Sequence, residues 1–293
     1  MFIVRIKGGL GNQMFQYATA KALAVRSKTD LRLDTVTGFR WDVFRRTYSL
    51  NAFNIRAATA SPSECFNYPG GRFVRAAVRT ANRCLPIRKR RYLCEGDLPA
   101  SGGLQNLTFD NSVYLDGYWQ RHEYFSSIQD ELRRDFTLRQ ALDPHSAAIE
   151  QTISKACSVA VHVRGLKGDS AAGVHVVDLP ILPKDYYRNA FDIMRSRLES
   201  PRFFVFTDGA DPGWMLGLCP GTTVVASDRN EGSANKELWL MSRCHHHIIA
   251  NSTFSWWGAW LQSNPGHIVL APDIKKYAQI ETLPPEWTVV GDC

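Results

Sequence analysis

The carboxyl-terminal half of the chain alternates short apolar runs with helical segments, and this alternation restricts the fold more than any other feature of the sequence. The apolar runs predict strands at 158–163, 202–207, 222–226, 247–250 and 267–271, the last strand of the chain. The segments between them predict helices at 184–198, 235–244 and 253–262. Strands separated by helices of about 10 to 15 residues form parallel sheets covered on both faces. We therefore expect an α/β fold.

The amino-terminal half opens in the same way. Residues 2–6 predict a strand, and Gly8 to Gly11 predict a turn before a helix that Asn12 caps and that runs to about Ser27. The elements expected after it are a strand at 31–34, an irregular insert at 35–110, a strand at 112–118 and a helix at 124–134. The carboxyl ends of the strands are the expected ligand side of such sheets.

A polar stretch at 138–150, which contains Pro144, is expected to separate two domains. The expected domains are 1–150 and 151–293, two Rossmann-like halves facing each other across a cleft. No run of about 18 apolar residues predicts a membrane-spanning helix. The amino terminus has no long apolar signal region, and the seven cysteines form no C-x-x-C pair. We expect a cytoplasmic protein with reduced thiols.

The first loop after a strand is glycine-rich and is a candidate ligand loop. A dinucleotide fingerprint that starts at Gly9 and Gly11 needs a glycine at position 14, where Met14 stands. Asp34 nevertheless lies at a spacing suited to a ribose, so a nicotinamide-dependent oxidoreductase stays an alternative. A tight turn would explain one or two glycines, whereas Gly9 and Gly11 followed by the amides of Asn12 and Gln13 favour ligand contact.

Two later strands also end in polar residues. His162 and Arg164 share one side of the strand 158–163, and the loop after it contains Asp169. Arg164 is suited to bidentate phosphate binding, or alternatively to an ion pair with Asp169 beside a core histidine. Asp208 follows the strand 202–207, where it is expected to bind a ribose hydroxyl or to cap the next helix.

The segment from Glu237 to Trp260 contains the longest candidate binding motif of the chain. The strand at 247–250 leads into Asn251, Ser252 and Thr253, and unpaired amides at the start of the following helix form an anion site. The three tryptophans of that helix are expected in the core. The run His245 to His247 does not favour a metal, because adjacent side chains of an extended segment point to alternate faces. No Asp-x-Asp occurs, so we expect no metal, and a pyrophosphate would be neutralised by Arg164 and the helix amino terminus.

These segments together resemble the α1,2-fucosyltransferases of glycosyltransferase family 11. The resemblance is carried in the family's order by Gly8-Gly-Leu-Gly-Asn-Gln-Met-Phe-Gln-Tyr-Ala18, Gly117-Tyr-Trp-Gln120 with Tyr124-Phe125, His162-Val-Arg164, Leu182-Pro183 with Tyr186-Tyr187, Phe206-Thr-Asp208, and Glu237 through Trp260. It implies a glycosyltransferase-B fold, a GDP-fucose donor bound by the carboxyl-terminal half, and inverting transfer to the 2-hydroxyl of a galactose. Another fucosyl linkage is a further alternative.

The resemblance also implies roles for single residues. Arg164 would hold the pyrophosphate, Glu237 would read the guanine, and Asn12 would face the reaction centre. The phosphate-binding turn would be Ser252, Thr253, Phe254 and Ser255. The family usually reads His-x-Arg-Arg-Gly-Asp, but Gly165-Leu166-Lys167 separates Arg164 from Gly168-Asp169 here, which leaves Lys167 as a weaker substitute for the second arginine. No spacing selects a base among Asp169, Asp178, Glu123 and His175.

The formal net charge of +7 comes from one segment, because residues 72–91 contain eight basic residues and no acid while the other 273 residues sum to −1. Arg72, Arg75, Arg79 and Arg83 have helical spacing, which gathers them on one face. We expect this face to rest on the anionic inner surface of a membrane, where a lipid-linked glycan acceptor would be met. A solvated basic helix and a nucleic-acid binder are the alternatives, the latter disfavoured by the lack of interleaved aromatic residues.

Overall fold

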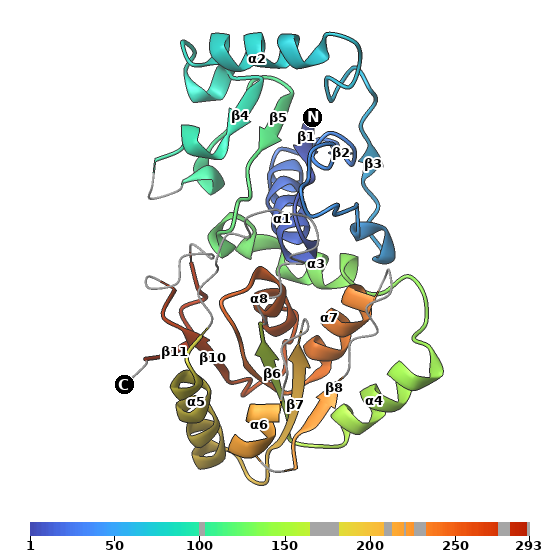
Figure 1. The fold of residues 1–293 in the computed structure, drawn as a ribbon. Coiled ribbons are helices and arrows are strands. Elements are labelled where there is room, and N and C mark those ends of the chain that lie inside the picture. The colour runs from blue at the N-terminus through green and yellow to red at the C-terminus, as the bar shows by residue number, and fades with distance from the viewer. Residues whose placement is uncertain are drawn as a thin grey trace. The chain divides into compact units, whose positions relative to one another are not determined.

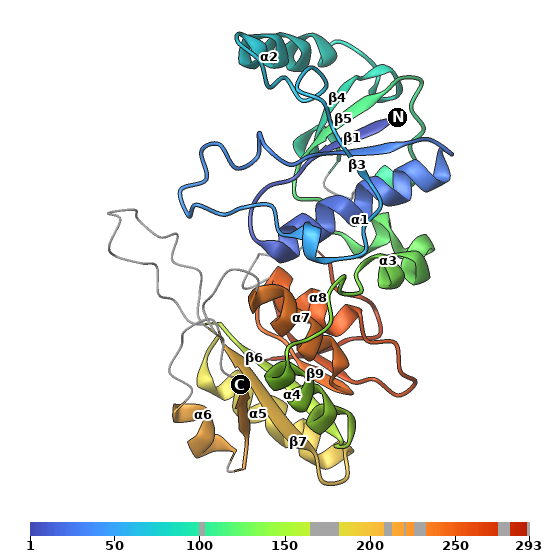
Figure 2. The same ribbon diagram turned by 90° about the vertical axis from the view of Figure 1, so that its right-hand side faces the viewer.

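The structure is a computed structural model that describes residues 1–99, 103–164, 182–207, 213–219, 221–225, 233–274 and 282–291. The chain divides into two compact units, Met1–Thr137 and Leu138–Cys293. Each unit contains one sheet, and every strand pair in both sheets is parallel. The expected α/β class with helices on both faces is confirmed (Figures 1 and 2).

The sheet of the first unit has the strand order β3-β2-β1-β5-β4. Its strands are β1 (Phe2–Arg5), β2 (Leu31–Asp34), β3 (Ala58–Thr59), β4 (Tyr92–Cys94) and β5 (Val113–Asp116). Its α-helices are α1 (Leu10–Arg26), α2 (Gly71–Asn82) and α3 (Gln129–Asp135). Helix α1 packs against β1 and β2, whereas α2 packs against β4 on the other face, as Figure 2 shows. The order reverses between β1 and β5, so the ends of these two strands form the expected ligand edge.

The second unit has the strand order β11-β10-β9-β6-β7-β8, the order of the doubly wound dinucleotide-binding fold. Its strands are β6 (Ser158–Val163), β7 (Arg202–Thr207), β8 (Thr223–Val225), β9 (His246–Ile248), β10 (Val269–Pro272) and β11 (Thr288–Val290). Its helices are α4 (Pro144–Ser154), α5 (Lys184–Arg197), α6 (Gly213–Leu218), α7 (Ser233–Arg243) and α8 (Thr253–Trp260). The reversal lies between β6 and β9.

Strand β6 is buried along its whole length, and its residues alternate between two cores. Val159, Val161 and Val163 pack with α5 and α6 on one face. Ala160 packs with α4 and α7 on the other face, toward which His162 is also directed by the two-residue period of a strand. This double burial explains why the sequence of β6 reads as a continuous apolar run.

Four sequence-based expectations need correction. The border between the units lies after Thr137, at the start of the expected stretch 138–150, and not at 150, which falls inside α4, a helix that packs on α7 of the second unit. The strand at 267–271 is not the last, because β11 follows it and pairs with β10. Asn12 does not cap α1, since the helix begins at Leu10 and Asn12 lies inside it. The helix expected at 124–134 is two 3₁₀ turns followed by α3.

The contact between α7 and α8 depends on a glycine. A Cβ atom at Gly258 would lie 2.4 Å from Sδ of the fully buried Met241. We expect Gly258→Ala to lower the free energy of unfolding by about 1–3 kcal/mol, because the core has no room for the added methyl. Urea denaturation measures this, and the double variant with Met241→Ala should lose less than the sum of the two single variants.

Gly217 in α6 gives the matched control, because a Cβ there would meet no described atom. Gly217→Ala is expected to be neutral or stabilising, as alanine is the better helix former. Equal losses in the two variants would contradict the packing argument.

Within the described part of the chain, no helix combines the length and the apolar character needed to cross a membrane. The six described cysteines form no disulfide with one another. The three tryptophans of α8 are buried, as expected.

Candidate functional site

The ends of β6 and β9 bring together two motifs that are far apart in the sequence. Arg164 follows β6, and Asn251 follows β9, which lies beside β6 in the sheet. The Nη1 atom of Arg164 lies 3.4 Å from the backbone oxygen of Asn251, to which it donates. This edge is where the strand order reverses, so the sheet topology itself places Arg164 and the Asn251 turn at the expected ligand position.

His162 contributes a buried imidazole beside them. Its side chain lies against the Phe254 ring, with the ring centres 5.6 Å apart, and burial together with the charge of Arg164 lowers the pKa of His162 to about 3. The imidazole is therefore neutral at physiological pH. Its Nδ1 atom is buried and has no hydrogen-bond partner among the described residues. A satisfied core histidine would have one, so this atom is suited to a polar group of a ligand.

The turn before α8 is held by its own hydroxyl groups. Ser252 caps the helix by accepting a hydrogen bond from the Phe254 amide at 3.3 Å. The Ser255 hydroxyl is fully buried, with the Ala250 carbonyl oxygen at 3.2 Å. These two side chains are thus committed to the turn. Thr253 and Phe254 are half-buried, and the first amides of α8 have no intrahelical partner, so backbone rather than hydroxyl groups would meet an anion.

The other predicted donor residues are placed in part. Glu237 is half-buried on α7, which packs against α8. Asp169 and Asp208 lie outside the described residues, as do Lys167, His175 and Asp178. Glu123 lies in a 3₁₀ turn of the first unit, with its carboxylate 3.5 Å from the His122 ring.

The three consecutive histidines each contact a different part of the second unit. The Nδ1 atom of His245 lies 2.9 Å from the Ser158 hydroxyl, and that of His246 accepts from the Ile268 amide. His247 is fully buried between His267 and the Met241 carbonyl oxygen. The three side chains are thus directed to separate partners, as expected for adjacent residues of an extended segment, and do not converge on one point.

The glycine-rich loop of the first unit is partly structural. Gly8 has a φ of 78°, which only glycine adopts without strain. The side chain of Gln13 is buried, donates to the Gly8 and Thr47 carbonyl oxygens and accepts from the Ser49 amide, each at 2.9 Å. Gln13 therefore holds the loop in place, and both N–H groups of its side chain are used within the protein.

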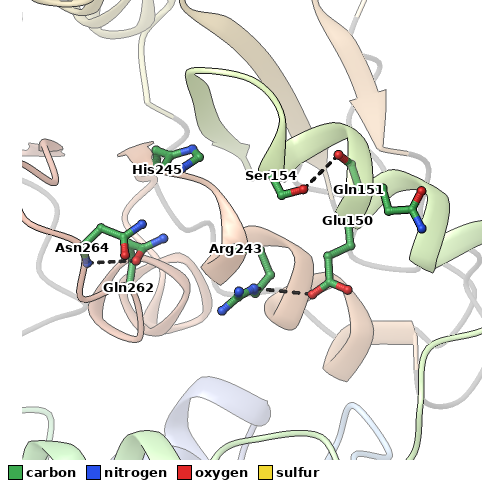
Figure 3. Close-up of a pocket in the computed structure, with 7 residues that line it drawn as sticks. All are labelled: Glu150, Gln151, Ser154, Arg243, His245, Gln262 and Asn264. Carbon is green, nitrogen blue, oxygen red and sulfur yellow. Dashed lines mark hydrogen bonds and ion pairs between the residues drawn. The ribbon is translucent and has the colours of Figure 1, made fainter.

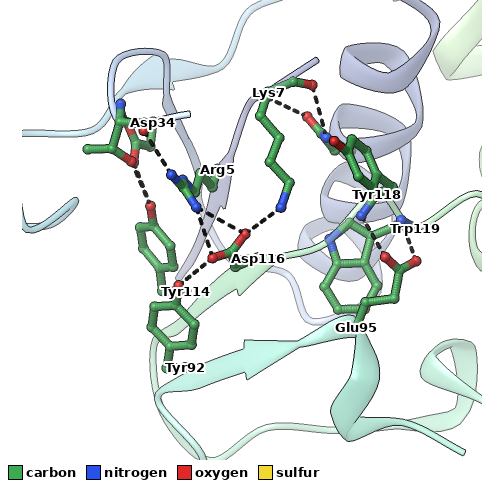
Figure 4. Close-up of polar contacts among 11 residues, drawn as sticks. Arg5, Lys7, Asp34, Tyr92, Glu95, Tyr114, Asp116, Tyr118 and Trp119 are labelled. Carbon is green, nitrogen blue, oxygen red and sulfur yellow. Dashed lines mark hydrogen bonds and ion pairs between the residues drawn. The ribbon is translucent and has the colours of Figure 1, made fainter. Parts of the chain in front are cut away.

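Asn12 is half-buried and accepts a hydrogen bond from Gln120 at 2.9 Å. Gln120 belongs to the turn after β5, so this turn meets the first turn of α1 at Asn12. Glu95 holds that turn, because its carboxylate accepts from the amides of Tyr118 at 2.7 Å and Trp119 at 2.6 Å (Figure 4). The amino-terminal loop thus forms one edge with the segment Gly117 to Gln120.

The sequence-based reasoning missed a charged cluster at this edge. Asp116, the last residue of β5, lies 2.8 Å from Nζ of Lys7 and 3.2 Å from Nη1 of Arg5, and it accepts from the Tyr92 hydroxyl at 2.5 Å (Figure 4). Burial would raise the pKa of Asp116, but Lys7 and Arg5 outweigh burial and lower it to about 2. Its position at a strand end was the available signal.

The Asp34 carboxylate is hydrogen-bonded to groups of the protein itself. It is buried and accepts from the amides of Val36 and Thr37, from the Thr37 hydroxyl, and from the Tyr114 hydroxyl at 2.5 Å. The ribose role that kept the oxidoreductase alternative open is therefore wrong.

A pocket of about 330 Å³ in the second unit is lined by residues of α4, of the end of α7 and of the segments before β9 and after α8 (Figure 3). Among its lining residues, His245 precedes β9 and contacts Ser158 at the start of β6, and Arg243 pairs with Glu150 at 3.4 Å. Because ligands of doubly wound sheets bind at the carboxyl ends of strands, we do not assign the donor to this pocket.

The chain is similar to a family of glycosyltransferases. The sequence model of Glycosyl transferase family 11 matches residues 102–290. The Escherichia coli alpha-1,2-colitosyltransferase is 31% identical over 276 residues, which cover 92% of this chain and 90% of the relative. The Rattus norvegicus galactoside alpha-(1,2)-fucosyltransferase 2 is 25% identical and covers 98% of this chain and 76% of its own.

Several solved structures share the fold. Among them is the NodZ alpha-1,6-fucosyltransferase soaked with GDP-fucose, with a TM-score of 0.52 at 16% sequence identity. The match covers 95% of this chain and 97% of the other. At this identity the likeness concerns the fold alone.

Proposed function

Because the chain belongs to glycosyl transferase family 11 and has the glycosyltransferase-B fold, we propose that it transfers L-fucose from GDP-β-L-fucose to the 2-hydroxyl of a galactose in a glycan. The observation that carries the proposal is the junction of Arg164 with the Asn251 turn at the reversal point of the second sheet. A guanidinium and a helix amino terminus side by side are suited to a pyrophosphate.

The reaction is an inverting substitution. The 2-hydroxyl oxygen of the acceptor forms a bond to the anomeric carbon of fucose, while the bond from that carbon to the phosphate oxygen of GDP breaks and GDP leaves with the electron pair. Negative charge grows on the departing phosphate, where Arg164 and the first amides of α8 stabilise it. The acceptor proton passes to a base, for which Asp169, Asp178, His175 and Glu123 remain the sequence-based candidates.

The remaining roles follow the same assignment. Glu237 reads the guanine, and Asp208 binds the ribose. The neutral imidazole of His162 donates to or accepts from the donor through its unpartnered Nδ1 atom. On the acceptor side, Asn12 lies where the turn after β5 meets the first turn of α1, with the exposed Tyr118 on the same segment as Gln120.

A colitosyl group is the second candidate for transfer, because one of the relatives that spans nearly the whole chain is named for it. Colitose is L-fucose without its 3-hydroxyl group. A site that hydrogen-bonds this hydroxyl discriminates strongly between the two sugars, whereas an apolar contact does not.

The experiment that tests the function is incubation of the protein with GDP-fucose and a panel of β-galactosides, followed by separation and linkage analysis of the products. We expect a fucosylated galactoside linked at the 2-hydroxyl, and GDP released in equal amount. Parallel reactions with GDP-colitose decide between the two sugars. GDP-fucose left intact with every galactoside would contradict the proposal.

We also propose that transfer needs no metal ion, since Arg164 and the α8 amides supply the positive charge and dipoles with which a metal ion would otherwise neutralise a pyrophosphate. The expected result is an unchanged initial rate after extensive dialysis against EDTA. A rate that falls with EDTA and returns with added Mg²⁺ or Mn²⁺ would overturn this part of the proposal.

A further inference from the structure

A second cationic site is formed by residues of the first unit alone. A pocket of about 440 Å³ lies between α2 and the sheet. Its lining includes five arginines and one acid: Arg5, Arg72, Arg75, Arg79, Arg83 and Asp116. The basic face predicted for residues 72–83 is thus real, and it borders a concave site rather than a flat surface.

The only described acid that lines this pocket is already neutralised. Asp116 is bonded to Lys7, Arg5 and the Tyr92 hydroxyl. Arg5 brings one further donor, because its buried Nε atom has no hydrogen-bond partner among the described residues. The pocket therefore keeps a surplus of positive charge.

The four arginines that α2 and its end contribute have no such compensation. Within the described parts of the chain, Arg72, Arg75, Arg79 and Arg83 form no ion pair with a carboxylate. The nearby Arg88 and Arg90, in contrast, pair with Asp110 and Asp97. Like charges gathered on one helix face repel one another, and a bound anion would relieve this repulsion.

We propose that this pocket binds the phosphate or diphosphate group of a ligand. Guanidinium groups match phosphate oxygens in bidentate geometry, and the volume suffices for one or two phosphate groups. The residues that form this site belong to the first unit, whereas Arg164, which would hold the donor pyrophosphate, belongs to the second. It adds to the proposed function a place where a phosphorylated molecule is held.

The phosphate group could belong to a lipid or to a water-soluble molecule, and the exposed surface of α2 bears on this choice. Phe73 is 65% exposed and Val74 is 43% exposed. An apolar flank beside a basic one is typical of helices that lie in a membrane interface. A lipid phosphate would therefore need both flanks, whereas the phosphate of a water-soluble molecule would need the arginines alone.

The test is calorimetric titration of the full chain with inorganic pyrophosphate, carried out on the Arg164→Ala protein so that anion binding at the donor site is weakened without adding a second diphosphate. We expect Arg75→Ala/Arg79→Ala to weaken binding by at least about tenfold, the effect of removing charge-assisted hydrogen bonds. Arg88→Ala, from the same basic segment but outside the pocket, is the matched control and should bind like the parent protein. Absence of binding to the parent protein, or equal losses in both variants, would overturn the proposal.

Flotation with phosphatidylglycerol vesicles at low ionic strength then identifies the source. Flotation that requires both the arginine pair and Phe73, tested as Phe73→Ser, assigns the site to a lipid phosphate. Pyrophosphate binding without flotation assigns it to a water-soluble phosphate. Since Arg75 and Arg79 belong to the first unit, loss of fucosyl transfer in these variants is not part of the criterion, and the proposed function can fail while this site stands.

Discussion

Arg164→Ala is expected to lower the turnover of fucosyl transfer by at least about tenfold, because it removes one group that stabilises transition-state charge. Arg164 lies 3.4 Å from the Asn251 oxygen, at the edge where the donor phosphate would sit. Because charge on this phosphate grows as the sugar bond breaks, the loss should appear in kcat as well as in kcat/KM. Initial rates over a range of GDP-fucose concentrations measure both constants.

Two further variants sharpen this prediction. Arg164→Lys keeps the charge but not the planar pair of donors, so we expect a rate between those of the parent protein and the alanine variant. Arg202, an exposed residue at the opening of β7 that contacts Thr223, is the matched control in the same sheet. Arg202→Ala should leave turnover unchanged. Parent-like turnover in Arg164→Ala would remove Arg164 from the catalytic site.

Asp116→Asn is expected to lower the free energy of unfolding by about 2 kcal/mol, because it leaves Lys7 and Arg5 without their counter-ion. The fall of the Asp116 pKa from 3.8 to about 2 corresponds to a similar free energy. Urea denaturation measures the change. Asp192, whose side chain is 67% exposed and pairs with Arg195, is the control, and Asp192→Asn should stay within about 0.5 kcal/mol of the parent protein.

The same residue predicts a pH dependence. The folded-state pKa of Asp116 lies below its ordinary value, so its contribution to stability is complete above about pH 4 and is lost as the pH falls toward 2. The Asp116→Asn variant should lack this part of the acid sensitivity. Equal acid sensitivity of the two proteins between pH 4 and 2 would show that Asp116 is not the paired carboxylate described above.

The strands and helices were largely predictable because they are set by local patterns. The continuous apolar run of β6 and the alternating helices after it predicted the second sheet correctly. Arg164 and Asn251 were recognised as candidates because each follows such a run. Strand β11 was missed since three residues are too short to show a period. The border lies at the start of the stretch 138–150 and not at its end, because α4 begins within this stretch at Pro144.

The roles of several polar residues were not predictable in the same way. Gln13 was predicted to bind a ligand, and Asp34 was an alternative ribose ligand. The side chains of both form hydrogen bonds within the protein. Asp116 was not considered, although three groups distant in the sequence converge on it. A sequence shows which side chains can bind, but their partners are chosen by contacts across the fold.

The sequence by itself determined the fold class, the family, the main strands and helices, and the two motifs that end β6 and β9, because these depend on periodicity and on short runs of residues. Only the tertiary structure decided that β6 lies beside β9, which joins Arg164 to a turn 87 residues away. It also decided that the arginine face of α2 borders a pocket with Arg5 and Asp116. The physical reason is that hydrogen bonds and ion pairs join groups by distance in space, and strand order sets that distance independently of separation along the chain.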